Sequence, residues 1–321
     1  MSGSAALNVA VLDDYQHVAP SLADWASLQP QANTVFFHDH VSDADALAAR
    51  LAPFDAVVLM RERTRFDANL LARLPRLKLI VSVGMWNAAI DLDAAKSRGI
   101  VVSGTTGGDA AATPALTWSL ILAATRNLYG EAASLRAGGW QTRVGMDVNG
   151  KTLGVLGLGR IGEAVARIGV AFGMRVIAWS QNLSSERAAE VGVQRVEKDE
   201  LFREADVLTI HLKLGDRTKG LVGARELGLM KPGAYLVNTS RGPIVSEDAL
   251  IEALQERRIG GAALDVFDEE PLAAGHPFRF LPNVLATPHI GYVTENTYRV
   301  AYPQIVEAIR AWIDGAPIRQ L

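Results

Sequence analysis

Short apolar runs alternate with helical patterns along almost the whole chain. In the first third, brief runs rich in Val and Ile predict strands over residues 8–12, 34–37, 56–60, 77–81 and 100–102. Ala, Leu and charged residues at helical spacing predict helices over 21–28, 43–51, 68–74 and 92–97. Strands that alternate with helices in this way are typical of βαβ units around a parallel sheet.

A second alternating series follows a glycine-rich break over 103–108, a long Ala/Leu helix over 113–127 and a further break at Gly138 and Gly139. Its apolar runs predict strands over 152–156, 175–179, 207–210, 234–238, 262–266 and 284–286, with helices over 247–257 and 294–313 among the connections. Ser246 is the expected N-cap of the first of these helices, and Gly315 ends the second. The pattern predicts an α/β protein with two Rossmann-like or flavodoxin-like parallel-sheet domains, and a ligand cleft between them.

Composition fits this architecture and excludes several classes of protein. The 321 residues are 49% hydrophobic and 21% charged, which is a normal globular balance. The absence of cysteine excludes disulfides and thiolate chemistry and favours a cytoplasmic location. A net charge of −3, with both signs mixed along the chain, argues against a nucleic-acid partner.

Membrane and metal sites are not expected either. The N-terminus lacks the basic leader of a signal peptide. The longest apolar run, over 110–125, is shorter than the roughly 20 residues that a membrane span needs, so it predicts a buried helix. The six histidines are scattered and show no metal-ligand spacing.

A dinucleotide signature opens the second series. The predicted strand over 152–156 leads directly into Gly157-Leu-Gly159-Arg160-Ile161-Gly162, the pattern G-x-G-x-x-G ahead of a helix. The first glycine makes the tight turn, the second leaves room for a pyrophosphate, and the third lets helix and strand pack closely. The phosphates would then meet the free N–H groups of the helix N-terminus.

The choice between NAD and NADP stays open in the sequence. About twenty residues beyond the glycines, where NAD-binding sites offer an acidic residue to the ribose, this chain has Ser180. A missing carboxylate removes the repulsion that excludes a 2′-phosphate, and Arg187 or Lys213 could assist one. Against that, no arginine follows Ser180 directly, so NAD is slightly favoured, and solvated charges are the simpler interpretation of Arg187 and Lys213.

Three later segments carry reactive groups at predicted strand ends: Asn238-Thr-Ser-Arg-Gly-Pro243, Leu264-Asp-Val-Phe-Asp-Glu-Glu-Pro-Leu272 and Thr287-Pro-His-Ile-Gly291. Together with the glycine loop and Met230-Lys-Pro-Gly233, they resemble, in order and spacing, the D-isomer-specific 2-hydroxyacid dehydrogenases. The likeness runs from about Leu74 to Tyr292. It implies hydride transfer between NAD(P)(H) and C2 of a small D-2-hydroxy or 2-keto acid.

The resemblance also assigns catalytic roles, and chemistry explains them. Arg241 offers a planar, two-pronged donor for the substrate carboxylate and carbonyl oxygen. His289 can donate the proton in reduction and accept it in oxidation. Glu270, which precedes Pro271 as the family's catalytic Glu does, would orient that imidazole.

Further site residues follow from the resemblance alone. Asp265 should hydrogen-bond the nicotinamide carboxamide, while Leu212, Thr218, Ser240 and Gly291 should line the cofactor site. The backbone amides of Val83 and Gly84 should meet the substrate carboxylate. Trp86 either caps the substrate pocket or belongs to the core, and Arg61-Glu62-Arg63 is a salt-bridged surface or an extra cationic site for an anionic substrate tail.

Domain organisation is implied in the same way. Residues 1–104 and 292–321 should form a substrate-binding domain into which a cofactor domain, 105–291, is inserted. The Ala-rich helix over 113–127 should pack in a homodimer. The chain stops about thirty residues after His289, so a C-terminal regulatory domain is not expected.

Two alternatives remain. A dinucleotide-sensing, non-enzymatic protein of the corepressor type would keep this fold without turnover, and a dehydrogenase of another small anion, such as formate or phosphite, would share the cofactor site. His211 should pack near the adenosine side, and His38, His40 and His276 should be structural.

Overall fold

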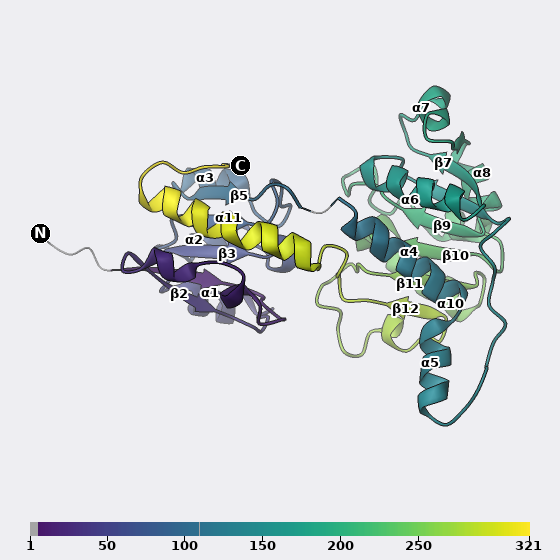
Figure 1. The fold of residues 1–321 in the computed structure, drawn as a ribbon, viewed down its shortest axis with the longest axis horizontal. Helices are drawn as coiled ribbons and strands as arrows, with labels where there is room; N and C mark the ends of the chain where they lie inside the picture. Colours follow the sequence, from purple (N-terminus) through teal and green to yellow (C-terminus); the bar gives the residue numbers. More distant parts are fainter. Residues whose placement is uncertain (1–5, 109) are drawn as a thin grey trace, which may run out of the picture. The chain divides into compact units, whose positions relative to one another are not determined.

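Two parallel sheets organise the chain, one in each of two compact units (Figure 1). The structure is a computed structural model, and it describes residues 6–108 and 110–321. Unit 1 comprises Met1–Asp109 and Thr294–Leu321, and unit 2 comprises Ala110–Val293. The predicted α/β fold class with two parallel-sheet domains is confirmed.

The sheet of unit 1 has the strand order β2-β1-β3-β4-β5, with every pairing parallel. Its strands are β1 (Leu7–Val11), β2 (Ala32–Phe36), β3 (Ala56–Leu59), β4 (Leu79–Ser82) and β5 (Val101–Gly104). Strands β3 and β4 are buried at every position, as expected for parallel strands covered on both faces. The five predicted strands are all present, with ends shifted by one or two residues.

The helices of unit 1 are α1 (Ala44–Leu51), α2 (Ala68–Ala72), α3 (Leu92–Ser97) and α11 (Glu295–Ile313), with short 3-10 turns η1 (Ala19–Ser21), η2 (Trp25–Leu28) and η3 (Arg61–Arg63). Helix α11 packs over β4 and β5, so the C-terminal segment completes this unit. The single helix predicted over 21–28 is wrong. Asp24 accepts a hydrogen bond from the Ser27 N–H and starts a separate 3-10 turn there.

The sheet of unit 2 has the order β12-β11-β10-β9-β6-β7-β8, again parallel throughout. Its strands are β6 (Thr152–Leu156), β7 (Arg175–Trp179), β8 (Gln194–Arg195), β9 (Val207–Ile210), β10 (Tyr235–Asn238), β11 (Gly261–Leu264) and β12 (Val284–Ala286). The chain order reverses on either side of β6, so the glycine loop that follows β6 emerges beside the switch point, where open sheets of this type bind ligands.

Helices flank this second sheet (Figure 1). They are α4 (Ala112–Thr125), α5 (Leu128–Arg136), α6 (Arg160–Ala171), α7 (Ser185–Ala189), α8 (Lys198–Glu204), α9 (Ala224–Leu229) and α10 (Glu247–Gln255), with 3-10 turns η4 (Gly242–Ile244) and η5 (Pro277–Arg279). Ser246 is the N-cap residue of α10, although its side chain makes no capping hydrogen bond. The sequence did not predict α5, none of whose residues is buried in the described structure. Among the described residues, no helix is long and apolar enough to cross a membrane.

Candidate active site and dinucleotide pocket

The three glycines after β6 each occupy a position with a different spatial demand. Gly157 has φ +104, and an added Cβ would lie 2.8 Å from the backbone of His211. A Cβ on Gly162 would lie 2.0 Å from the Gly157 carbonyl oxygen. At Gly159, by contrast, a Cβ would meet no described atom within 4 Å. The loop is therefore closed around its first and third glycines and open at the second, which fits a pyrophosphate.

Helix α6 starts directly at this loop, with Gly159 as its N-cap and Arg160 as its first residue. The first N–H groups of a helix lack intrahelical partners and favour an anion. The Ile161 side chain is partly buried and packs against the core of the unit. The residues present thus fit the phosphates of a dinucleotide.

An open pocket of about 540 Å³ lies beside the loop, lined by Gly159, Arg160, Glu163, Arg167 and Arg187, among others. Glu163 accepts hydrogen bonds from Arg167 (2.8 Å) and Arg187 (2.5 Å), and Arg187 also binds Glu190 at 2.8 Å. The Arg167 side chain holds the pKa of Glu163 below its usual range. Arg187 is therefore paired at the pocket rather than simply solvated. Glu163 and Arg167 were not predicted as site residues from the sequence, although their i,i+4 spacing was a usable signal.

Ser180 is the residue directly after β7. Its hydroxyl oxygen accepts a hydrogen bond from the N–H of Leu158, a residue of the glycine loop, at 3.0 Å. The side chain at this position is thereby held against the glycine loop. No acidic residue replaces it at the end of β7.

Other predicted cofactor residues lie on the segments after β9 and β10. The Leu212 side chain comes within 2.9 Å of the Cβ position on Gly157, and its carbonyl accepts a hydrogen bond from the Ser240 hydroxyl. The Thr218 hydroxyl bonds with Lys213 O (2.6 Å) and Gly215 N (2.9 Å), which closes a turn there. Leu212 and Ser240 are thus brought to the glycine loop, while Thr218 organises a neighbouring turn.

Glu270 and His289 form a direct pair. One carboxylate oxygen of Glu270 lies 2.6 Å from His289 Nδ1, and the other accepts the N–H of Phe267 at 2.9 Å. Both side chains are partly exposed, at 22% for His289 and 32% for Glu270. The edge of the Tyr292 ring also contacts the imidazole. The contact with the carboxylate engages Nδ1, the nearer of the two ring nitrogens to Glu270.

The loop that carries His289 is anchored by Asp265, at the end of β11. Its carboxylate accepts hydrogen bonds from the Thr287 hydroxyl (2.6 Å) and from the N–H groups of Ile290 and Gly291, each at 2.8 Å. Asp265 is only 1% exposed, and burial raises its pKa. His289 itself has φ +51, a left-handed conformation that a side chain adopts at a cost. The bonds of Asp265 on either side hold the loop in that conformation.

Arg241 follows β10 in a loop braced by Asn238. The Asn238 side chain accepts the Ser240 N–H at 3.0 Å and donates to Arg241 O at 2.9 Å. At Gly242 an added Cβ would lie 2.1 Å from the Phe267 carbonyl carbon. The Arg241 loop therefore packs on the segment that Glu270 also binds. Asn238 opens one of the three segments named from the sequence but was given no role there, although Asn at a strand end before a turn is a known local signal.

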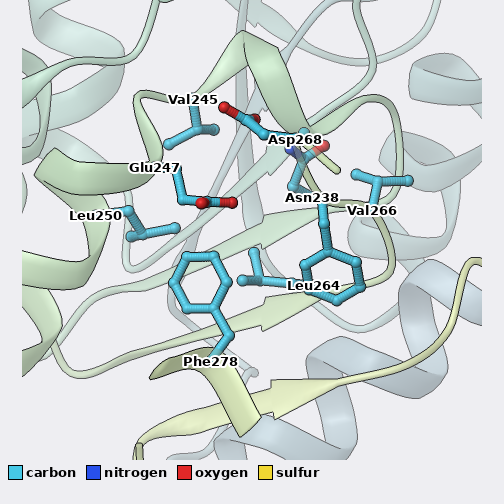
Figure 2. Close-up of a pocket in the computed structure, with 10 residues that line it drawn as sticks. Asn238, Val245, Glu247, Leu250, Leu264, Val266, Asp268 and Phe278 are labelled. Atoms are coloured by element: carbon cyan, nitrogen blue, oxygen red, sulfur yellow. The ribbon is translucent and has the colours of Figure 1, made fainter. Parts of the chain in front are cut away.

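A small cavity lies behind these loops, lined by Asn238, Glu247, Asp268 and Phe278, among others (Figure 2). Its volume of about 10 Å³ admits no more than one water molecule. Burial, followed by the nearby charge of Glu247, raises the pKa of Asp268. The cavity is part of the packing beneath the active-site loops and is too small for a substrate.

The predicted carboxylate-binding turn follows β4 in unit 1. Gly84 has φ +93, and Arg61 approaches its Cβ position to 3.0 Å. The N–H of Val83 donates to Leu59 O (3.1 Å) and that of Gly84 to the Thr105 hydroxyl (2.9 Å), so both amides are engaged within the unit. Trp86 is 55% exposed, which excludes the core role considered for it.

Four of the five other histidines have hydrogen-bond partners for their imidazole rings. His211 Nε2 bonds with the Thr209 hydroxyl at 2.9 Å, and His276 Nε2 bonds with Glu247 at 3.0 Å. His38 and His40 bond with the backbone of Asp14 and the carboxylate of Asp13. No group of three or more potential metal ligands occurs in the part of the chain that the structure describes.

Known proteins share this architecture. A family model described as D-isomer specific 2-hydroxyacid dehydrogenase, NAD binding domain, matches residues 118–291. A glyoxylate reductase of Aeropyrum pernix is 44% identical over 243 residues, which cover 73% of this chain and 72% of that protein. The chain belongs to the D-isomer-specific 2-hydroxyacid dehydrogenase family. As a member, it is a nicotinamide-linked oxidoreductase of small 2-hydroxy and 2-keto acids.

Two further relatives of this dehydrogenase differ in how much of their length it covers. A D-3-phosphoglycerate dehydrogenase of Methanocaldococcus jannaschii is 38% identical over 262 residues, which are 81% of this chain but 50% of that protein. The chain thus spans half of that relative's length. The solved structure of a phosphoglycerate oxidoreductase from Vibrio cholerae has a TM-score of 0.91 at 41% identity, covering 97% of this chain and 100% of that one.

Proposed function

We propose that this dehydrogenase reduces a small 2-keto acid, and oxidises the corresponding D-2-hydroxy acid, with Arg241, Glu270 and His289 as its catalytic residues. The observation that carries the proposal is the 2.6 Å contact between Glu270 and His289 Nδ1. A carboxylate in this position fixes the tautomer of the imidazole and stabilises its protonated form. His289 Nε2 is then the atom that gives a proton to the substrate carbonyl oxygen in reduction and takes it back in oxidation.

In this proposal, Arg241 binds the anionic substrate. Its guanidinium binds the carboxylate and polarises the carbonyl, which lowers the cost of the charge that develops on the oxygen. Val83 and Gly84 belong to the same proposal as carboxylate ligands, with the Gly84 amide available if the Thr105 hydroxyl turns away. The adjacent Arg61 supports an anionic substrate at this turn.

The cofactor is NAD or NADP, and the loop from Gly157 to Gly162 would hold the phosphates that both share. When bound, the dinucleotide supplies or accepts the hydride. Leu212, Thr218, Ser240 and Gly291 line its site in this proposal. The Asp265 carboxylate already accepts three hydrogen bonds from the loop that it anchors. A hydrogen bond to the nicotinamide carboxamide would use one of its remaining lone pairs.

We propose in addition that the protein is a cytoplasmic homodimer. Support for the dimer comes from α5 and the segment after it, which expose large apolar side chains at Leu128, Tyr129, Leu135 and Trp140. Apolar surface of this kind commonly marks a protein–protein interface. A monomeric mass in light scattering, unchanged in a Tyr129→Glu variant, would contradict the dimer.

A substrate screen tests the enzymatic proposal. Glyoxylate, hydroxypyruvate, pyruvate and 3-phosphohydroxypyruvate are each assayed with NADH and NADPH at the absorbance band of the reduced nicotinamide, with formate and phosphite assayed in the oxidative direction. His289→Ala should lower kcat by about 10²- to 10⁴-fold. The matched control is His276→Ala, because His276 also pairs with a carboxylate. Turnover that survives in the His289 variant would refute the assigned acid–base role, and binding of dinucleotide without turnover of any substrate would favour the corepressor-like alternative.

A further inference from the structure

The pocket beside the glycine loop has a charge pattern that bears on which dinucleotide it takes. Three guanidiniums, of Arg160, Arg167 and Arg187, and one carboxylate, of Glu163, line it among the described residues. Its lining therefore carries a net positive charge. A dinucleotide's pyrophosphate is already served by the helix N-terminus, so these side chains are in excess of what NAD requires.

The neighbouring strand end removes the usual obstacle to a further phosphate. Ser180 stands where NAD-specific sites place a carboxylate, and its bond with the Leu158 N–H holds it against the glycine loop. A hydroxyl at this position neither repels a 2′-phosphate nor fills its space. The side chain can also donate its own hydrogen to a phosphate oxygen.

Two of the guanidiniums are held at the pocket by a carboxylate partner that a phosphate can replace. Glu163 bridges Arg167 and Arg187, which holds both at the pocket. Their side chains are 57% and 49% exposed, and ion pairs at such sites contribute little to stability. A phosphate dianion can therefore replace the Glu163 carboxylate as the partner of Arg187 at small cost, with a charge-assisted, two-pronged hydrogen bond in return.

We infer that this subsite binds the 2′-phosphate of NADP(H), with Arg187 and Arg167 as its phosphate-binding residues. Glu163 is the partner of both arginines when no phosphate is bound. The inference rests on the proposed function, since it assigns the adenosine end of the same cofactor site. It reverses the slight preference for NAD drawn from the sequence, where the absence of an arginine directly after Ser180 stood against NADP. The arginines come instead from α6 and α7.

The test measures nucleotide binding without turnover. Isothermal titration of the intact protein compares adenosine 2′,5′-bisphosphate with adenosine 5′-monophosphate. The wild type should bind the bisphosphate about 10-fold or more tightly, and Arg187→Ala should remove most of that preference. The matched control is Arg175→Ala, an exposed arginine at the opposite end of β7 that pairs with Glu204 and should leave the ratio unchanged.

A Glu163→Gln variant distinguishes a site for NADP from a site for NAD. If Glu163 only neutralises the arginines, its loss keeps or tightens bisphosphate binding. If it accepts the ribose hydroxyls of NAD, its loss weakens monophosphate binding selectively, which would overturn the inference. Equal affinity of the wild type for the two probes would also overturn it. Turnover with NADH alongside such equal affinity would leave the proposed function standing, whereas absence of both binding and turnover would defeat the proposed function itself.

Discussion

His211 links the stability of unit 2 to pH. The residue follows β9, bonds with the Thr209 hydroxyl at 2.9 Å, and lies against the first glycine of the dinucleotide loop. Burial lowers the pKa of its imidazole from 6.5 to about 3. The folded protein therefore holds His211 neutral at every pH at which an exposed imidazole would begin to protonate.

The sign and size of the effect follow from that shift. Between pH 6.5 and about 3, the unfolded chain binds a proton at this residue that the folded protein does not bind. The free energy of unfolding must then fall as pH falls, by up to about 1.4 kcal/mol per pH unit. Integrated from pH 7 to pH 5, the contribution of His211 alone is about 2 kcal/mol.

Urea unfolding at pH 7 and pH 5 isolates this contribution. His211→Gln removes the titration and retains a side chain able to bond with Thr209. The loss of stability on going from pH 7 to pH 5 should be about 2 kcal/mol smaller in the variant than in the wild type. All other titrating groups are shared and cancel in this comparison. If the two proteins lose the same amount, His211 is accessible to protons in the folded state, and the reasoning from burial is refuted.

The active-site loops give three further predictions. Glu270→Gln should lower kcat by about 10²-fold in steady-state assays, because His289 loses its charged partner; an unchanged kcat would contradict the pairing. Gly242→Ala should destabilise the protein by at least about 2 kcal/mol in urea unfolding, because the new Cβ meets the Phe267 backbone; wild-type stability would show that this loop can shift freely. Asp265→Asn should cost about 2–4 kcal/mol and lower kcat, since an amide cannot accept all three hydrogen bonds, and retention of both values would refute its anchoring role.

The strands of unit 2 were well predicted because their signal is local. The ranges expected for β6, β7, β9 and β12 agree with the structure, since each is a short Val-, Ile- or Leu-rich run between breaks. Helix α5 was missed because its apolar residues are exposed and form no buried face. Strand β8 was missed because two residues, Gln194 and Arg195, carry no periodicity.

In the site, too, features set by neighbouring residues in the sequence could be predicted, and features set by tertiary packing could not. The glycine loop could be predicted because its three glycines stand at fixed spacing in one six-residue segment directly after β6, even though the close neighbour of Gly157 is the distant His211. The pairing of Arg187 with Glu163 could not, since 24 residues separate them and only the packing of α7 near α6 brings them together. The internal use of the Val83 and Gly84 amides was also beyond the sequence, because it depends on the neighbouring strands β3 and β5.

The groups proposed as catalytic depend on polar contacts with residues outside that proposed set. Asp265 binds the Thr287 hydroxyl before His289 and the N–H groups of Ile290 and Gly291 after it. Asn238 holds the backbone of Arg241, and Gly242 allows the Arg241 loop to approach Phe267. Glu270 belongs to both sets, since one of its oxygens binds Phe267 N and the other binds His289. A glutamine at position 270 can keep the bond to Phe267 while losing the charge on the imidazole. Loss of activity without loss of stability in that variant would therefore separate orientation of the loop from electrostatic support of His289.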